Sequence, residues 1–186
     1  MIMSFASPLG VGLTSDGEYL DIEVLSTDSS AEMVKRLNDT MVEGVEVLSY
    51  RKLPDDAENA MSIVAACDYT IVLRDDYENG LSMTAEEFYN GLLDFIENGN
   101  LNIVKKTKKG EKEMDLKPLI YEAHRGADGN GLFLQLSSGS AANVKPELVL
   151  EAYCKSLGKE YPQFAFRINR EEVYADAGEH DFVTLE

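Results

Sequence analysis

A run of carboxylates near the start of the chain is the first place where chemistry could occur. Asp16, Glu18, Asp21 and Glu23 lie within eight positions, at a turn and along the strand predicted to follow it. Such a cluster is either a solvated strand face or a site for a divalent cation or an amine, and carboxylates also serve as general acids and bases. The chain contains 34 acidic residues, so no single pair is specific. We therefore favour the solvated face.

Three arginines near the ends of predicted strands are candidates for binding an anion. Arg125 follows His124, and Arg167 and Arg170 lie at the end of the last predicted strand. A guanidinium can hold a phosphate or a carboxylate with forked hydrogen bonds. In so acidic a chain the same arginines can instead pair with neighbouring Asp or Glu, and the sequence leaves both interpretations open. His124 is either a proton shuttle or, more commonly, a strand-end residue with a satisfied hydrogen bond.

A short basic segment interrupts an acidic chain. The net charge is −15 over residues 1–100, +3 over residues 101–118 and −5 over residues 119–186, which gives −17 in total. Binding of nucleic acid over the whole surface is thereby excluded, because it requires a basic field. A hairpin from Lys105 to Lys112 could still follow phosphates, but it has no aromatic residue on which bases would stack. An exposed ribbon kept soluble by lysine is the favoured interpretation. The lysines of the segment are Lys105, Lys106, Lys108, Lys109, Lys112 and Lys117.

Several kinds of site lack the residues that they need. Cys67 and Cys154 are the chain's two cysteines, which is too few for an iron–sulfur cluster of the radical SAM type. The chain also has two histidines, and none of these cysteines and histidines is paired at ligand spacing, so a structural zinc site is improbable. A phosphate-binding glycine loop and a nucleophile elbow are both absent from the sequence. We expect no cofactor and no metal, and, without a visible signal peptide or membrane span, a cytoplasmic protein.

The elements that would position these residues follow from hydrophobic periodicity. Apolar residues with period two predict strands over residues 19–25, 45–53, 69–73, 101–106, 132–136 and 164–168. Helical spacing predicts helices over residues 31–41, 58–67, 84–98 and 146–157. Thr84 and Glu87 are spaced as a capping box, and Gly99 suits a left-handed cap at the end of that helix. A turn at residues 14–17 suggests a hairpin ahead of the first strand.

The order of these elements predicts an α+β fold. From residue 69 onward the order is strand, helix, strand, inserted hairpin, strand, helix, strand, which is the ferredoxin-like split βαβ pattern with antiparallel pairing. The first half resembles a similar unit without its opening strand and helix. We therefore expect a partial unit over residues 1–67 and a unit with an inserted lysine-rich hairpin over residues 68–186. An incomplete sheet exposes an edge, which would allow a homodimer.

Three segments resemble blocks of a known family. They are SFASPLGVG with GEYLDI (residues 4–12 and 17–22), DLKPLI (residues 115–120) and INREEVY (residues 168–174). Over most of its length the chain resembles the radical SAM-linked protein family, whose members are encoded beside, or fused behind, a radical SAM protein. Family members usually begin with a further stretch that carries a His-Leu-Asp motif and is absent here. The chain is accordingly expected to start at an internal methionine or to be a natural short form.

The resemblance implies an accessory role and marks candidate binding residues. Ser7, Glu18, Tyr19 and Asp21 lie in its first block, and the later blocks contain Asp115, Lys117 and Arg170.

Three functions are compatible with these observations. The favoured one is an accessory or substrate-presenting module for a radical SAM protein, with no activity of its own. The alternative is an RNA-binding module that uses the lysine hairpin with Arg125, Arg167 and Arg170. An enzyme that uses Glu18, Asp21 or Asp115 as acid or base is a residual third hypothesis.

Overall fold

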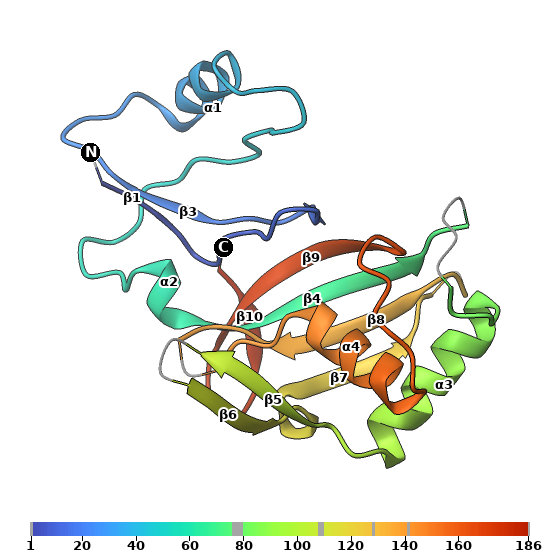
Figure 1. Cartoon of the computed structure of the whole chain (residues 1–186). Helices are drawn as coiled ribbons and strands as arrows, with labels where there is room; N and C mark the ends of the chain where they lie inside the picture. The colour runs from blue at the N-terminus through green and yellow to red at the C-terminus, as the bar shows by residue number, and fades with distance from the viewer. Residues whose placement is uncertain (1, 76–79, 108–109, 128, 141, 186) are drawn as a thin grey trace.

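The computed structural model describes residues 2–75, 80–107, 110–127, 129–140 and 142–185, and the chain has the expected α+β fold (Figure 1). Its central unit consists of four strands and two helices. In chain order they are β4 (Val64–Leu73), α3 (Ala85–Asn98), β7 (Ile120–Arg125), β8 (Leu132–Ser137), α4 (Pro146–Ser156) and β9 (Phe166–Asp176). The strands lie side by side in the order β9-β4-β8-β7, and each neighbouring pair is antiparallel. This is the strand order of the β-α-β-β-α-β unit that the sequence predicted.

A two-stranded hairpin is inserted between α3 and β7, as predicted, but the predicted strand over residues 101–106 belongs to this hairpin and not to the central sheet. It comprises β5 (Asn102–Thr107) and β6 (Gly110–Asp115), which pair with each other and not with the central sheet. A 3-10 turn, Lys117–Leu119, leads from it into β7. Lys108 and Lys109, at the tip of the predicted lysine hairpin, lie outside the described residues.

Both ends of the chain extend the central sheet along the outer edge of β9. The short strand β2 (Thr14–Ser15) is parallel to β9 at Asn169 and Arg170, and β10 (Phe182–Thr184) is antiparallel to its last three residues. The predicted hairpin at residues 14–17 is therefore wrong. The strand that follows the turn, β3 (Leu20–Glu23), pairs instead with β1 (Ile2–Phe5), because residues 6–19 form a long excursion that reaches β9.

Residues 24–63 contain less regular structure than the sequence suggested. Helix α1 (Ser30–Asn38) is present with Ser29 as its N-cap, but residues 45–53, all described, pair with no strand. The Asn38 side chain instead contacts the backbone N–H and carbonyl of Val47, at 2.7 and 2.9 Å. Alternation therefore did not predict a strand correctly here, because a strand also requires a partner.

The predicted helix over residues 58–67 is also largely wrong. It is reduced to α2 (Ala60–Ile63), and β4 begins at Val64. The apolar run that suggested a helix is a strand buried on both faces, which periodicity alone does not distinguish from a helix. Strand β4 also crosses the predicted boundary between residues 67 and 68, and the division into two units stays a prediction.

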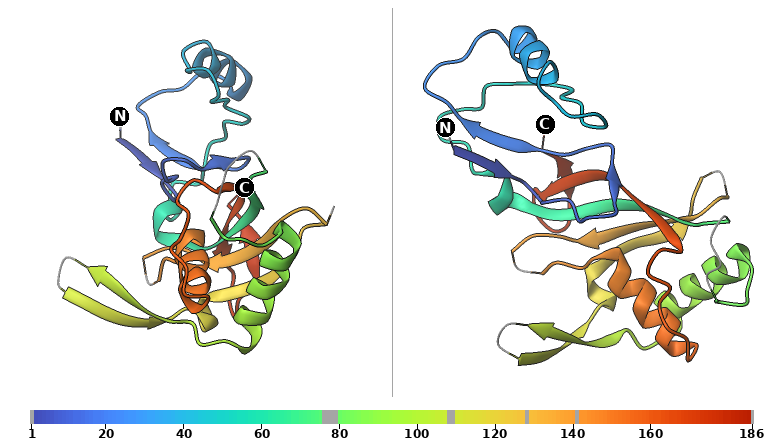
Figure 2. Two further views of the ribbon diagram at one scale, coloured as in Figure 1. Left: turned by 45° about the vertical axis from the view of Figure 1, so that its right-hand side comes forward. Right: turned by 45° about the horizontal axis from the view of Figure 1, so that its top comes forward.

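Helices α3 and α4 cover one face of the central sheet, and the core lies between them and the strands (Figures 1 and 2). The Phe88 ring of α3 packs on Tyr153 of α4 and Phe166 of β9, with centroids 5.2 and 5.1 Å apart. Of the buried apolar residues that form this core in the described chain, one, Ala6, precedes Ala60. The β1–β3 ribbon and α1 project away from the sheet (Figure 2).

The capping box at the start of α3 is confirmed, whereas the predicted left-handed cap at its end is wrong. The Thr84 hydroxyl accepts from the Glu87 backbone N–H, and the Glu87 carboxylate accepts from the Thr84 backbone N–H. Gly99 is extended, with φ −83° and ψ 177°. Its small size serves another purpose, because a Cβ there would lie 2.4 Å from the Phe95 ring.

Replacing Gly91 with alanine tests the contact between the two helices. A Cβ at Gly91 would lie 2.0 Å from the Tyr153 hydroxyl oxygen. We expect Gly91→Ala to lower the free energy of unfolding by about 1–3 kcal/mol in urea denaturation, although alanine is the better helix former by about 1 kcal/mol. Tyr153→Phe in the same chain should restore part of the loss, with Tyr153→Phe alone as control. A double variant no more stable than Gly91→Ala would contradict this explanation.

Candidate functional site

A buried arginine joins the N-terminal segment to the central sheet. Arg170 lies on β9 opposite Tyr69, on the face that the helices cover, and its side chain is 3% exposed. The register of β4 and β9 shifts at this point, so that Glu171 is an extra residue between the pairs Asp68–Glu172 and Tyr69–Arg170. Such a bulge redirects the side chains that follow it.

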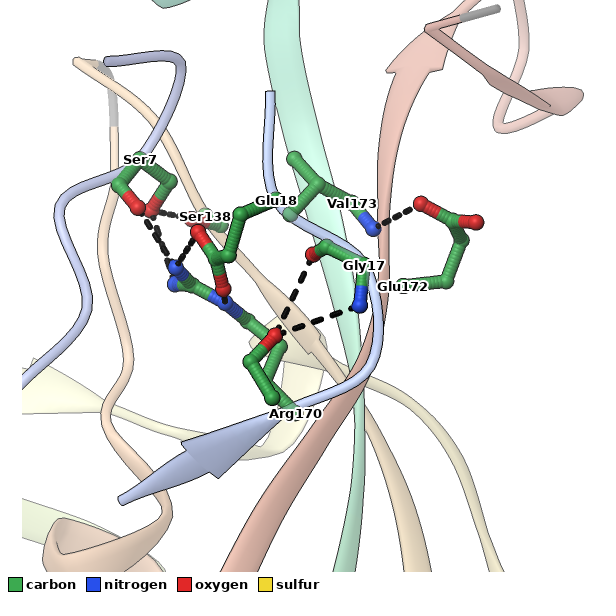
Figure 3. A network of polar contacts seen from close by, with 8 residues as sticks. Ser7, Gly17, Glu18, Ser138, Arg170, Glu172 and Val173 are labelled. Atoms are coloured by element: carbon green, nitrogen blue, oxygen red, sulfur yellow. Dashed lines mark hydrogen bonds and ion pairs between the residues drawn. The ribbon is translucent and has the colours of Figure 1, made fainter. Parts of the chain in front are cut away.

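Glu18 and Ser7 take the hydrogen bonds of this guanidinium (Figure 3). Arg170 Nε and Nη2 donate to the two carboxylate oxygens of Glu18, at 2.8 and 2.5 Å. Nη2 also donates to the Ser7 carbonyl at 2.5 Å, and Nη1 to the Ser7 hydroxyl at 3.2 Å. The structure thus brings together three of the residues that the sequence singled out, and it shows that Arg170 is paired with a carboxylate.

Backbone pairing holds Glu18 in place. The Asp16 N–H donates to the Arg170 carbonyl at 3.0 Å. The Asn169 side chain accepts from the Thr14 hydroxyl at 2.7 Å and donates to the Asp16 carboxylate at 2.6 Å. At Gly17 a Cβ would lie 3.0 Å from the Glu171 carbonyl, so glycine allows the loop to approach β9 closely.

The surroundings of Arg170 are polar but poorly reactive. Cys67 and Tyr69 lie beside it on β4, and burial raises the pKa of both, so the thiol and the phenol are neutral at pH 7. Ser138 contacts Cys67 and lies 3.5 Å from the Ser7 hydroxyl. Because protein groups already occupy Nε, Nη1 and Nη2 of Arg170, the arrangement is suited to fixing the loop rather than to holding a substrate.

A second polar cluster lies on the opposite face of the sheet. Asp68 is 8% exposed and accepts hydrogen bonds from Gln135 at 2.9 Å and from the Tyr174 hydroxyl at 2.8 Å. Burial, and then the negative charges of Glu171 and Glu122, raise its pKa against those hydrogen bonds. The face of the sheet that the two helices leave uncovered, which we call the open face, therefore carries a largely buried carboxylate with further acidic groups around it.

Tyr19 and Asp21, the other candidates of the first block, have local structural contacts. The Tyr19 carbonyl accepts from the Ala6 N–H at 2.9 Å, and its side chain packs against the core. Asp21 accepts from the Ala60 N–H at 2.7 Å and thereby helps to cap α2. Neither contact brings a second acidic side chain to the Arg170 cluster.

Asp115 and Lys117 lie at the C-terminal end of α3. Asp115 accepts from the Lys117 N–H at 2.9 Å, and the Lys117 ammonium donates to the Glu97 carbonyl. A lysine at this position satisfies a carbonyl of the last turn and complements the helix dipole. These two residues lie on a different part of the molecule from Arg170.

The remaining two arginines are separate from Arg170 and from each other. Arg125 donates to Asn90 at 3.1 Å and to the Gly129 carbonyl at 2.5 Å, and its guanidinium lies 4.9 Å from the centre of the Tyr89 ring. Arg167 is exposed on β9, opposite Val72. The three arginines therefore do not line one cleft. His124 contacts the Arg125 carbonyl through Nδ1 at 2.7 Å and stacks on Phe133.

Sequence reasoning missed the β4 residues that face both clusters. Asp68 follows Cys67 and precedes Tyr69 in the apolar run Val64–Leu73. A charged residue inside such a run was the available signal, because a buried carboxylate requires hydrogen-bond donors. Tyr174 had no comparable signal, since β9 is longer than predicted and its last residues were not assigned to a strand.

Residues 1–146 match the sequence model of a family described as "Uncharacterized protein conserved in bacteria (DUF2344)". The chain belongs to this family. The match extends from β1 to the first residue of α4, so it includes Ser7 and Glu18 but ends before Arg170. The description states neither an activity nor a partner. No curated protein and no solved structure matches the chain.

Two features are absent from the residues that the structure describes. These residues contain no group of three His, Cys, Asp or Glu side chains placed to hold a metal ion. Within the same part of the chain, no helix has the length and apolar character needed to cross a membrane.

Removing Glu18 tests whether the ion pair stabilises the fold. Glu18→Ala leaves a buried guanidinium without its carboxylate, which should lower the free energy of unfolding by about 3 kcal/mol in urea denaturation. The exposed Glu23→Ala on β3 is the control and should change it by less than about 0.5 kcal/mol. The double variant Glu18→Leu with Arg170→Met should be more stable than Glu18→Ala. Equal losses for Glu18→Ala and Glu23→Ala would contradict the role of the pair.

The raised pKa of Asp68 predicts a specific dependence of stability on pH. Because the pKa of Asp68 is higher in the folded than in the unfolded state, its ionisation weakens the fold as pH rises through the folded-state value. Asp68→Asn should therefore gain stability relative to wild type as pH rises above about 4, the ordinary pKa of an unfolded-state Asp. Urea denaturation at several pH values measures this difference, with the exposed Asp181→Asn as control for the loss of one charge. A difference that shrinks as pH rises would refute the assignment.

Proposed function

We propose that the protein is a non-catalytic accessory module that docks on a radical SAM protein or presents that protein's substrate. Residues 2–59, which we call the N-terminal arm, would form the docking surface. The kind of partner follows from the resemblance of residues 4–22, 115–120 and 168–174 to the radical SAM-linked protein family. The docking surface is inferred from the structure of the arm.

The main support is that the N-terminal arm has almost no core of its own. Within the arm, Ala6 is the one apolar residue that is buried. None of the nine described residues of α1 is buried, and a helix of that length is marginal in water without packing. Apolar side chains that find no core in the described chain are the expected mark of a surface that another protein covers.

The exposed side chains are large and distributed over the whole arm. Leu25 is fully exposed, and Leu48 is 73% exposed. The other large apolar residues of the arm that the structure leaves exposed are Ile2, Met3, Phe5, Leu9, Val11, Val24, Met41, Val42, Val45 and Leu53. Single exposed apolar residues are ordinary on a protein surface, but a set of this size in one segment is not.

The charge of the arm indicates the complementary partner surface. It contains 12 acidic and 4 basic residues, a net charge of −8. A partner surface with apolar residues inside a basic rim would complement it, and the association rate would then fall as ionic strength rises. The Arg170–Glu18 pair connects this arm to the central sheet, so that docking on the arm also positions the sheet.

Co-purification with the radical SAM protein that the proposal expects to be encoded beside this chain tests it. Full-length chain should retain that protein on an affinity column. Leu25→Glu with Leu48→Glu should weaken retention at least tenfold, because the two changes place charges on the proposed apolar docking surface. Both side chains are exposed, so the changes do not disturb the core. Val183→Glu on β10, exposed but outside the arm, is the matched control and should retain the partner. Absence of association, or equal retention by both variants, would contradict the proposal.

The homodimer predicted from the sequence can be tested with the same purified chain and variants. Light scattering of the chain alone would reveal a dimer, and a dimer broken by the Leu25 and Leu48 changes would assign the arm to self-association instead.

RNA binding, the alternative prediction, is less well supported. The open face of the central sheet carries acidic residues around Asp68, and the donors of Arg170 are occupied by Glu18 and Ser7. Salt-dependent binding of RNA by the purified chain would favour this alternative over the accessory role.

A further inference from the structure

We propose that the outer edge of β7, together with α3, forms a second docking site, which takes an extended segment of a partner protein as an added strand. This site lies on the central unit and does not involve the N-terminal arm. The occupant is an extended segment in which apolar residues alternate with polar ones, including a lysine or arginine. Three features support this site: the free strand edge, the groove beside it and the charges that line the groove.

In the described part of the chain, β8 is the one strand that pairs with β7. The Gly126 N–H donates to the Gly131 carbonyl at 3.1 Å, and the pairs Glu122–Gln135 and His124–Phe133 continue the same register. In an antiparallel ladder hydrogen-bonded and non-hydrogen-bonded pairs alternate. Glu122 and His124 therefore direct their backbone groups toward β8, whereas Ala123 and Arg125 direct theirs toward the free edge. The Arg125 carbonyl there also contacts His124 Nδ1, at 2.7 Å.

A groove of about 420 Å³ follows this edge. Its walls are Leu93, Ile96 and Glu97 of α3 and the whole of β7. A helix beside an unpaired strand edge is the arrangement in which domains bind peptides by strand addition, because the edge supplies hydrogen bonds and the helix supplies side-chain pockets. Leu93 and Ile96 are half-buried, so apolar side chains on one face of the added strand would cover them.

The groove has acidic and basic groups at different positions. Glu97 and Glu122 are exposed and would attract a basic side chain of the added strand. Arg125 is held by Asn90, the Gly129 carbonyl and the Tyr89 ring, so its guanidinium is not offered to the added strand. An extended segment that carries a basic side chain matches the free edge, the half-buried α3 side chains and the exposed carboxylates.

A display library of random ten-residue peptides, selected on the immobilised full chain, is the probe. We expect enriched peptides to alternate apolar and polar residues and to carry Lys or Arg. Ala123→Pro removes the outward N–H, and Ala123→Gly keeps it as the matched control. Peptides synthesised from the enriched set should bind Ala123→Pro about tenfold more weakly than Ala123→Gly, as expected for the loss of one hydrogen bond and the edge geometry.

A second variant guards against misfolding of Ala123→Pro. Glu122→Lys is an exposed change and should reverse the preference between a lysine peptide and its glutamate analogue. Hydrogen exchange should slow at the Ala123 amide on peptide addition, while that of Glu122, already bonded to β8, should change little. Three results would overturn the proposal. They are a library enriched no more on the wild-type chain than on Ala123→Pro, equal peptide affinity of the two Ala123 variants, and protection of the Ala123 amide that rises with protein concentration in the absence of peptide. The last result would assign the edge to a second copy of the chain.

The proposed binding at the N-terminal arm and the proposed binding at the β7 edge can be refuted independently. The Leu25 and Leu48 changes leave the β7 edge intact, and the Ala123 and Glu122 changes leave the arm intact. A wild-type chain that binds no peptide but retains the radical SAM protein would therefore refute the edge site alone.

Discussion

The need to neutralise one buried guanidinium determines how the two ends of the chain are connected. Arg170 cannot remain charged in the core without a carboxylate, and the structure provides Glu18, which is 152 residues earlier in the sequence. Because Glu18 follows β2, the ion pair and the β2–β9 pairing depend on each other. The bulge at Glu171, the close approach at Gly17 and the position of Ser7 all follow from that contact.

This contact joins two parts of the molecule that have different sources of stability. The central unit buries apolar side chains between a four-stranded antiparallel sheet and two helices, whose packing includes the Phe88 and Tyr153 rings. The N-terminal arm contributes Ala6 to that core, packs the half-buried Leu13 and Tyr19 against it, and otherwise depends on polar contacts and on the short β1–β3 ribbon. Polar contacts hold the arm in place, but most of its apolar side chains are not buried. This is the property expected of a surface that a partner protein covers.

The sequence predicted the parts of the fold that local patterns control. The capping box at Thr84 and Glu87, the inserted hairpin and the order of the central elements follow from spacing alone. Residues 45–53 alternate like a strand but lack a partner, and Val64–Leu73 hides its strand character because both faces are buried. For the site, family-like blocks identified Ser7, Glu18 and Arg170 separately. Their contact depends on the β9 register, and Asp68 acquires its raised pKa from tertiary burial, so neither was visible in the sequence.

Hydrogen exchange of the arm, free and with the radical SAM protein proposed as its partner, tests the account most directly. In the free chain the amides of α1 should exchange far faster than those of β4, because α1 buries no residue whereas β4 lies in the middle of the sheet. Addition of the partner should slow exchange in α1 and leave β4 unchanged. Amides of α1 as protected as those of β4 in the free chain, or unaffected by the partner, would contradict the claim that the N-terminal arm is a docking surface.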